Sequence, residues 1–246
     1  MQRVLLSVRC RSASRRSHVL ARCCRDRCGH GEPAALDDAV VRATVLANPS
    51  MSPGWPADGS FFVSIAAYRD PDLFPTIADG LAKARHPERL RFGICWQYGS
   101  ELTGSEHLSG SQFAVHYVDA RLSRGVCWAR AEIMKLYDGE DWYLQLDSHH
   151  RFTQDWDEKL VEQAELTGSP RPVLSTYAAG FTPDREAEAA EHVTTMEFDC
   201  FTEHGVLLPK SAIVPEPRVT PIRARFLSAH FLLRGDLVRS GLVSLA

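Results

Sequence analysis

Apolar runs separated by turn residues predict five strands in this chain. They are FFVSIAAYRD at 61–70, RLRFGICWQYG at 89–99, QFAVHYVDA at 112–120, DWYLQLDSHHRF at 141–152 and PVLSTYAAG at 172–180. Short apolar runs of this kind are typical of buried strands. The first run ends at Asp70-Pro71, a pair that is typical of a turn.

Three segments between these runs have the spacing of helices. They are LFPTIADGLAKA at 73–84, GVCWARAEIMKLYDG at 125–139 and WDEKLVEQAELTG at 156–168. Pro75 suits the first turn of the first helix, and Gly139 is a stop signal for the second. One face of the second helix is apolar and carries Val126, Ala129, Ile133 and Leu136.

The alternation of strands and helices predicts an α/β fold, in which helices flank a mostly parallel central sheet. A chain of 246 residues suits one such core. We place the domain at residues 59–246. Residues 1–58 are expected to be an extension and linker outside it, because 31–58 contain Pro33, Pro49, Pro53 and Pro56.

The first 30 residues differ from the rest in charge and in cysteine content. They hold eight arginines against one acid, Asp26. This composition imitates an organellar transit peptide, but a disordered basic arm or a true start at Met51 explains it as well, and we favour these two. Cys23, Cys24, Cys28 and His30 could be taken for a zinc site, although their spacing fits no strong template.

Charge and hydropathy argue against two classes of partner. The formal net charge is −3 at pH 7, which gives no sign of the basic face that binds nucleic acid. The chain contains no run of about 18 apolar residues, so we expect no membrane-spanning helix. Cys95, Cys127 and Cys200 lie far apart, as structural free thiols do, so we expect a cytoplasmic protein without a disulfide framework.

Polar residues gather where the predicted strands end. Ligands of open α/β sheets bind outside the carboxyl ends of the strands. The first strand ends at Arg69 and Asp70, and the fourth ends at Asp147 and His149. We therefore expect these side chains to border one site.

A helix start adds a place for phosphate near these strand ends. Gly125 opens the helix that carries Arg130. Helix starts offer unpaired N–H groups and a positive dipole end, and a guanidinium can bind a diphosphate with two donors. The pattern favours an anionic ligand.

The D-x-H element of Asp147 and His149 predicts a metal site. Residues i and i+2 of an extended chain point to the same side, so both side chains can reach one cation. A carboxylate prefers Mg or Mn, and an imidazole shifts the balance toward Mn. By the same parity we expect His150 to point away from Asp147 and to be structural or solvated rather than a ligand.

Several stretches resemble a known family. FFVSIAAYRDPDLFPTIADGLAKA, RGVCWARAEIMKLYDGEDWYLQLDSHHRF and WDEKL resemble the GlcNAc-transferase family of polypeptide α-N-acetylglucosaminyltransferases, whose founding members modify hydroxyproline on a cytoplasmic ubiquitin-ligase adaptor. The similarity covers roughly residues 60–183 and returns at ARFLSAHF, 224–231. D-S-H is also similar to the metal motif of mucin-type GalNAc-transferases. The resemblance implies a GT-A glycosyltransferase fold, a UDP-sugar donor, a divalent cation, retention of anomeric configuration, and a protein or peptide acceptor.

The resemblance also implies roles for single residues. Those matching the donor-binding positions are Arg69, Asp70, Gly125, Arg130 and Asp147, and those matching the metal ligands are Asp147 and His149. Other interpretations stay open, since Asp70 could cap a helix and Arg130 could be a surface arginine. Trp156 and Asp157 could border an acceptor groove, but we interpret them first as a hydrophobic anchor and an acid at a helix start.

The family pattern is not followed after FLSAHF. Members continue with acidic residues near the sugar and a later histidine that completes the metal shell, whereas this chain continues with LLRGDLVRSGLVSLA. We therefore name no catalytic residue and expect a domain truncated at its C-terminus.

Three functions are weighed: a metal-dependent UDP-GlcNAc transferase, a truncated inactive domain that binds a nucleotide or a partner, and a metal-dependent hydrolase. The missing acidic segment favours the second over the first, and the lack of further His and Asp ligands near residues 147–150 argues against the third.

Overall fold

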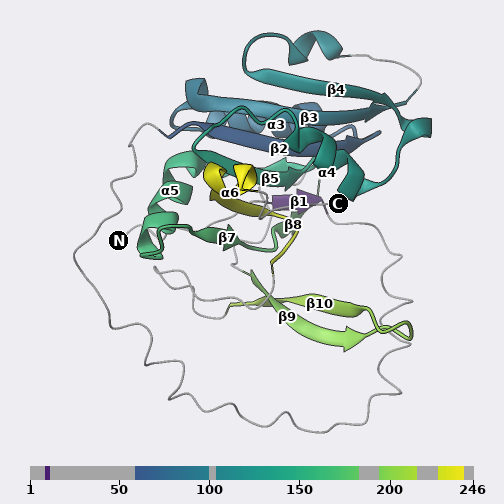
Figure 1. Cartoon of the computed structure of the whole chain (residues 1–246), viewed down its shortest axis with the longest axis vertical. Coiled ribbons are helices and arrows are strands. Elements are labelled where there is room, and N and C mark those ends of the chain that lie inside the picture. Colours follow the sequence, from purple (N-terminus) through teal and green to yellow (C-terminus); the bar gives the residue numbers. More distant parts are fainter. Residues whose placement is uncertain (1–8, 12–58, 100–103, 183–193, 215–226, 241–246) are drawn as a thin grey trace, which may run out of the picture.

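The computed structural model describes residues 9–11, 59–99, 104–182, 194–214 and 227–240. Its centre is a six-stranded sheet with the order β4-β3-β2-β5-β11-β7 (Figure 1). The strands are β2 (Phe61–Tyr68), β3 (Leu90–Tyr98), β4 (Phe113–Asp119), β5 (Trp142–Asp147), β7 (Val173–Ser175) and β11 (Phe231–Arg234).

Most of this sheet is parallel, as the sequence predicts. β2 pairs in parallel with β3 and with β5, and β3 pairs in parallel with β4. β11 is the exception, because it runs antiparallel to both of its neighbours, β5 and β7. The fold is therefore a mixed α/β fold with one reversed strand that the sequence analysis did not predict.

Helices cover both faces of the sheet. They are α3 (Leu73–Lys83), α4 (Val126–Met134), α5 (Trp156–Leu166) and the short α6 (Gly235–Arg239), with 3-10 turns at Pro87–Arg89, Ser105–Leu108 and Ala120–Leu122. Alternate residues of β2 face opposite ways: Phe61 joins the apolar cluster that includes α3 and α5, while Phe62 joins the one that includes α4 and α6.

The α4 helix is shorter than its pattern suggests. It ends at Met134 rather than near Gly139. Ala129 and Ile133 are fully buried as expected, but Val126 is 51% exposed. Val126 differs in that it is the first residue of the helix.

Smaller sheets lie outside the central one. The strands β6 (His150–Arg151), β1 (Arg9–Arg11) and β8 (Ala179–Phe181) form one of them, with β1 in the middle. β9 (Thr194–Phe201) and β10 (Leu207–Ile213) form a hairpin. The expected extension at 1–58 falls mostly outside the described residues, yet Arg9–Arg11 within it pair with two strands of the domain. In the described part of the chain, no helix has the length and apolar character needed to span a membrane.

Candidate functional site

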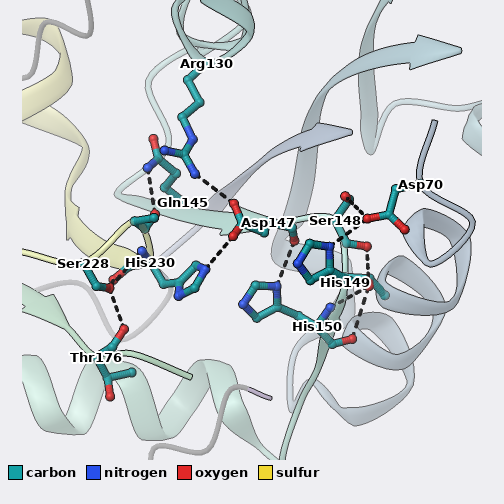
Figure 2. A network of polar contacts seen from close by, with 12 residues as sticks. Asp70, Arg130, Gln145, Asp147, Ser148, His149, His150, Thr176, Ser228 and His230 are labelled. Atoms are coloured by element: carbon teal, nitrogen blue, oxygen red, sulfur yellow. Dashed lines mark hydrogen bonds and ion pairs between the residues drawn. The ribbon is translucent and has the colours of Figure 1, made fainter. Parts of the chain in front are cut away.

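The carboxyl ends of β2 and β5 lie side by side, as parallel pairing requires. Ala66 of β2 pairs with Asp147, the last residue of β5. The chain then leaves both strands in the same direction. Asp70 on one side and the segment Asp147–His150 on the other thus form a polar cluster at this edge (Figure 2).

Asp147 is held on both carboxylate oxygens. Oδ1 accepts a hydrogen bond from Arg130 Nη2 at 2.9 Å, and Oδ2 lies 3.0 Å from His230 Nε2. The Arg130 side chain is only 11% exposed, so the interpretation as a surface arginine is wrong. Burial pushes the pKa of Asp147 upward, but the His230 hydrogen bond and the surrounding charges outweigh it and hold that pKa below its ordinary value.

His230 is the site residue that the sequence analysis missed. It is 5% exposed and lies just before β11, where the antiparallel pairing brings it next to β5. Gln145 Nε2 donates to the Ala229 carbonyl at 2.8 Å, and Ser228 Oγ accepts from the His230 backbone N–H at 3.0 Å. The one available signal was a histidine inside an apolar stretch, FLSAHFLL, to which no role was assigned.

Asp70 ties the end of β2 to the residues that follow β5. Its Oδ2 lies 2.7 Å from Ser148 Oγ and 2.7 Å from His149 Nδ1, and its Oδ1 accepts from the Asp72 backbone N–H at 2.9 Å. Burial raises the pKa of Asp70, but these three bonds lower it more, so the pKa is about 2. Asp70 is therefore ionised at neutral pH.

Strand parity does not extend through the D-S-H element, because β5 ends at Asp147. Beyond that residue the chain bends, and Asp147 and His149 are held by different partners (Figure 2). Because of this bend, the His150 side chain does not point away from Asp147. Its Nδ1 lies 2.9 Å from the Asp147 carbonyl oxygen, and its ring packs edge-on against His230 with centroids 4.6 Å apart.

Of the two expected alternatives, structural or solvated, His150 is structural. The side chain is fully buried, and burial lowers the pKa of His150 well below its ordinary value. A neutral imidazole that packs against His230 supports the side chain that contacts Asp147. His150 therefore belongs to the framework of the site, although it does not point away from Asp147 as predicted.

The two other residues predicted to bind the sugar donor, Arg69 and Gly125, are both exposed. Arg69 is exposed and has a φ of 50°, and its backbone N–H donates to the Gln97 carbonyl at 2.9 Å. A non-glycine residue with this φ is uncommon and often marks a functional edge. Gly125, with a φ of 94°, precedes α4, and an added Cβ there would meet nothing within 4 Å. The start of α4 is thus open and has no side-chain cap.

Trp156 and Asp157 are structural, in agreement with our first interpretation. The Trp156 ring is 4% exposed, and its Nε1 donates to the Gly80 carbonyl at 2.9 Å. The buried Asp157 carboxylate accepts from the backbone N–H groups of Arg85 and His86 at 2.7 and 2.9 Å. These two residues anchor α5 to the end of α3.

The residues at this edge partly fit a divalent cation. In the segments that the structure describes, no group of three or more His, Cys, Asp or Glu side chains is arranged to hold a metal ion. Asp147 and His149 supply a carboxylate and an imidazole, and the carboxylate of Asp70 lies against His149 as the partner of a metal-binding histidine commonly does. The donor types suit Mn or Mg, and such a site would depend on ligands from a substrate and from water.

The chain matches a known protein family. A family model described as Glycosyltransferase (GlcNAc) matches residues 60–107 and 99–240. These segments include both strand ends, α4 and His230. Among curated proteins, no match to the chain was found.

Proposed function

The chain belongs to the glycosyltransferase (GlcNAc) family, and from this we propose that it transfers N-acetylglucosamine from a UDP-sugar to a hydroxyl of a protein or peptide. The observation that carries the proposal is the Asp147–Arg130 pair. It joins the carboxyl end of β5 to α4, the helix that begins at Val126, at the sheet edge where α/β folds bind ligands. A GT-A fold and retention of anomeric configuration are part of the proposal and rest on the resemblance described above.

We assign binding of the UDP-sugar donor to the start of α4, to Arg130 and to the residues at the end of β2. The open start of α4 offers backbone N–H groups to a diphosphate. Further along the same helix, Arg130 donates from Nη2 to Asp147. Buried Arg130 Nε has no hydrogen-bond partner among the described residues, so the guanidinium has a donor left over. Arg69 and Asp70 stand on the other side, at the end of β2.

Asp147 and His149 are the proposed ligands of Mn or Mg. A divalent ion held there would stabilise the negative charge of the departing diphosphate. The chain's own contribution is to hold the carboxylate and the imidazole at a rigid strand end. Arg130 supplies positive charge at the same place.

A second candidate function is favoured by one observation. Both oxygens of Asp147 already have partners, Arg130 and His230, so a cation has to compete with them for this carboxylate. A domain that binds a nucleotide without metal, and does not transfer sugar, is consistent with this arrangement. This is the inactive binding domain weighed from the sequence.

Calorimetry with UDP, in the presence and absence of Mn, separates the two candidates. For the transferase, Asp147→Asn and His149→Ala should weaken UDP binding only when Mn is present. Asp147→Asn should have the larger effect, because opposite unit charges about 4 Å apart interact by roughly 4 kcal/mol at an effective dielectric of 20, a term that a neutral imidazole lacks. Release of UDP from UDP-GlcNAc, with and without a hydroxyl-bearing peptide, tests transfer directly.

The control is His204→Ala, because the His204 side chain is 83% exposed on the hairpin and remote in sequence from the site. His150→Ala is unsuitable, since His150 is fully buried against the Asp147 segment. UDP binding that is the same with and without Mn would support the second candidate. Absence of UDP binding under both conditions would refute both.

A further inference from the structure

The Asp70 carboxylate contacts the segment that follows β5. Its Oδ2 lies 2.7 Å from both His149 Nδ1 and Ser148 Oγ, two consecutive residues after β5. The Asp70 side chain is 14% exposed and that of His149 is 30% exposed, so the contact is partly shielded from water. Figure 2 shows the His149 ring between Asp70 and Asp147.

The chemistry of this contact fixes the state of the imidazole ring. An ionised carboxylate can only accept hydrogen bonds, so His149 Nδ1 has to carry the proton in the contact with Asp70. When the ring is neutral, its lone pair then lies on Nε2, which is the nitrogen on the far side from Asp70. Metal-binding histidines are commonly held in this way by a carboxylate on the other ring nitrogen, which orients the ring and increases its basicity.

The same contacts argue against a direct role for Asp70 on the nucleotide. Its two oxygens already accept three hydrogen bonds from Asp72, Ser148 and His149. A carboxylate also repels a diphosphate. Asp70 is therefore better suited to act through His149 than to touch the donor.

We propose that Asp70 is a positioning residue, whose carboxylate fixes the tautomer and orientation of His149 so that Nε2 is presented to the cation beside Asp147. This inference rests on the proposed function, because it assigns a support to one of the two proposed metal ligands. It changes the role of Asp70 from nucleotide contact to control of metal affinity.

The tautomer can be measured in the metal-free protein without any substitution. In a chain labelled with ¹⁵N-histidine, long-range ¹H–¹⁵N correlation spectra should show His149 protonated on Nδ1 and unprotonated on Nε2. The His149→Ala spectrum assigns the signal by its loss. A His149 ring protonated only on Nε2 overturns the inference, even if UDP and Mn bind as proposed.

Substitution of Asp70 tests the consequence for metal. With UDP present, Asp70→Ala should weaken Mn binding about 10–100-fold, as loss of such a supporting carboxylate typically does, and Asp70→Asn should weaken it less because the amide oxygen can still accept. Binding of UDP without metal should be unchanged in both. In a background that already carries His149→Ala, Asp70→Asn should cause no further loss, because the effect passes through the ring.

Two controls separate positioning from general destabilisation. Ser148→Ala removes the other partner of Asp70 Oδ2 and should leave Mn affinity within about twofold. Asp157→Asn disturbs another buried carboxylate, so it should lower the melting temperature without changing Mn affinity.

The outcomes distinguish the inference from the function on which it rests. If the unsubstituted chain binds UDP without regard to Mn, the proposed function fails and this inference fails with it. If Mn-dependent binding is present but both Asp70 variants keep full Mn affinity, only the inference is wrong. Should the Asp70 variants not fold, the tautomer of His149 in the unsubstituted chain decides.

Discussion

At the scale of single residues, Asp147 is held by an arginine on one oxygen and an imidazole on the other. Removing Arg130 leaves a half-buried carboxylate with one partner. We predict that Arg130→Met lowers the free energy of unfolding by about 1–3 kcal/mol. Asp147→Asn in the same chain should recover part of this loss, because the uncompensated charge is gone. Urea denaturation of the two single variants and the double variant measures these free energies. A loss in the double variant equal to the sum of the two single losses would show that the pair is not coupled.

The cysteines give a second prediction at this scale. Cys95 is fully buried in β3, and burial, with a smaller contribution from the Glu132 charge, raises the pKa of its thiol to about 11. Cys127 is exposed near the start of α4. At pH 8.5, iodoacetamide should therefore label Cys127 and spare Cys95, and both should react once urea unfolds the chain. Peptide mass mapping reads the result, and rapid labelling of Cys95 in the folded protein would contradict the core described for β3.

Several polar residues of this edge could be singled out from the sequence, but His230 and the pairings between the side chains could not. Asp147, Arg130 and His149 follow from strand ends and a helix start, which are local signals. The contact of His230 with Asp147 spans 83 residues and depends on a strand reversal. The strand-parity argument for Asp147 and His149 also required β5 to continue, whereas the strand ends at Asp147.

At the scale of elements, the Phe62 ring of β2 lies over Gly93 of β3 and leaves no room for a side chain there. An added Cβ would lie 2.0 Å from Cζ of Phe62. We predict that Gly93→Ala lowers the free energy of unfolding by about 1–3 kcal/mol, since the Phe62 ring has to leave its packed position. In a chain that carries Phe62→Leu, the same substitution should cost less. Thermal unfolding of the four combinations provides the test, and an equal cost in both backgrounds would mean that the ring is not the obstacle.

Elements defined by long apolar runs were predictable, and short ones were not. β2, β3, β4 and β5 fall within their predicted ranges because each is a long run of mostly apolar residues, and β2, β3 and β5 are almost wholly buried. β11 has only four residues, and its pairing partners lie far away in the sequence. A short apolar run does not specify a neighbour or a direction.

At the scale of the whole molecule, the β9–β10 hairpin stands apart from the central sheet (Figure 1) and carries exposed apolar side chains. Phe198 is 47% exposed and Phe201 is 57% exposed. We predict that the double substitution Phe198→Ser and Phe201→Ser leaves the melting temperature nearly unchanged and reduces aggregation on concentration, because large exposed apolar patches promote association.

The matched comparison for the hairpin is Phe231, which is 5% exposed in β11. Phe231→Ala should cost about 3–5 kcal/mol of folding free energy, since it opens a cavity in the core. Light scattering and calorimetry on the two variants provide the contrast. A large drop in melting temperature for the hairpin variant would place its two phenylalanines in the stabilising core instead.

The position of β11 has a consequence for synthesis of the protein on the ribosome. β11 occupies an inner place in the sheet, between β5 and β7, yet it is the last of the six strands to be translated. Gln145 and Ala229, which it brings together, are 84 residues apart. At about 5–20 residues per second, roughly 4–17 s separate their emergence. During that interval the nascent chain presents an open edge of β5 to its surroundings, and open strand edges are where other chains pair. Slow codons between these segments would lengthen this exposure without altering any residue of the finished protein.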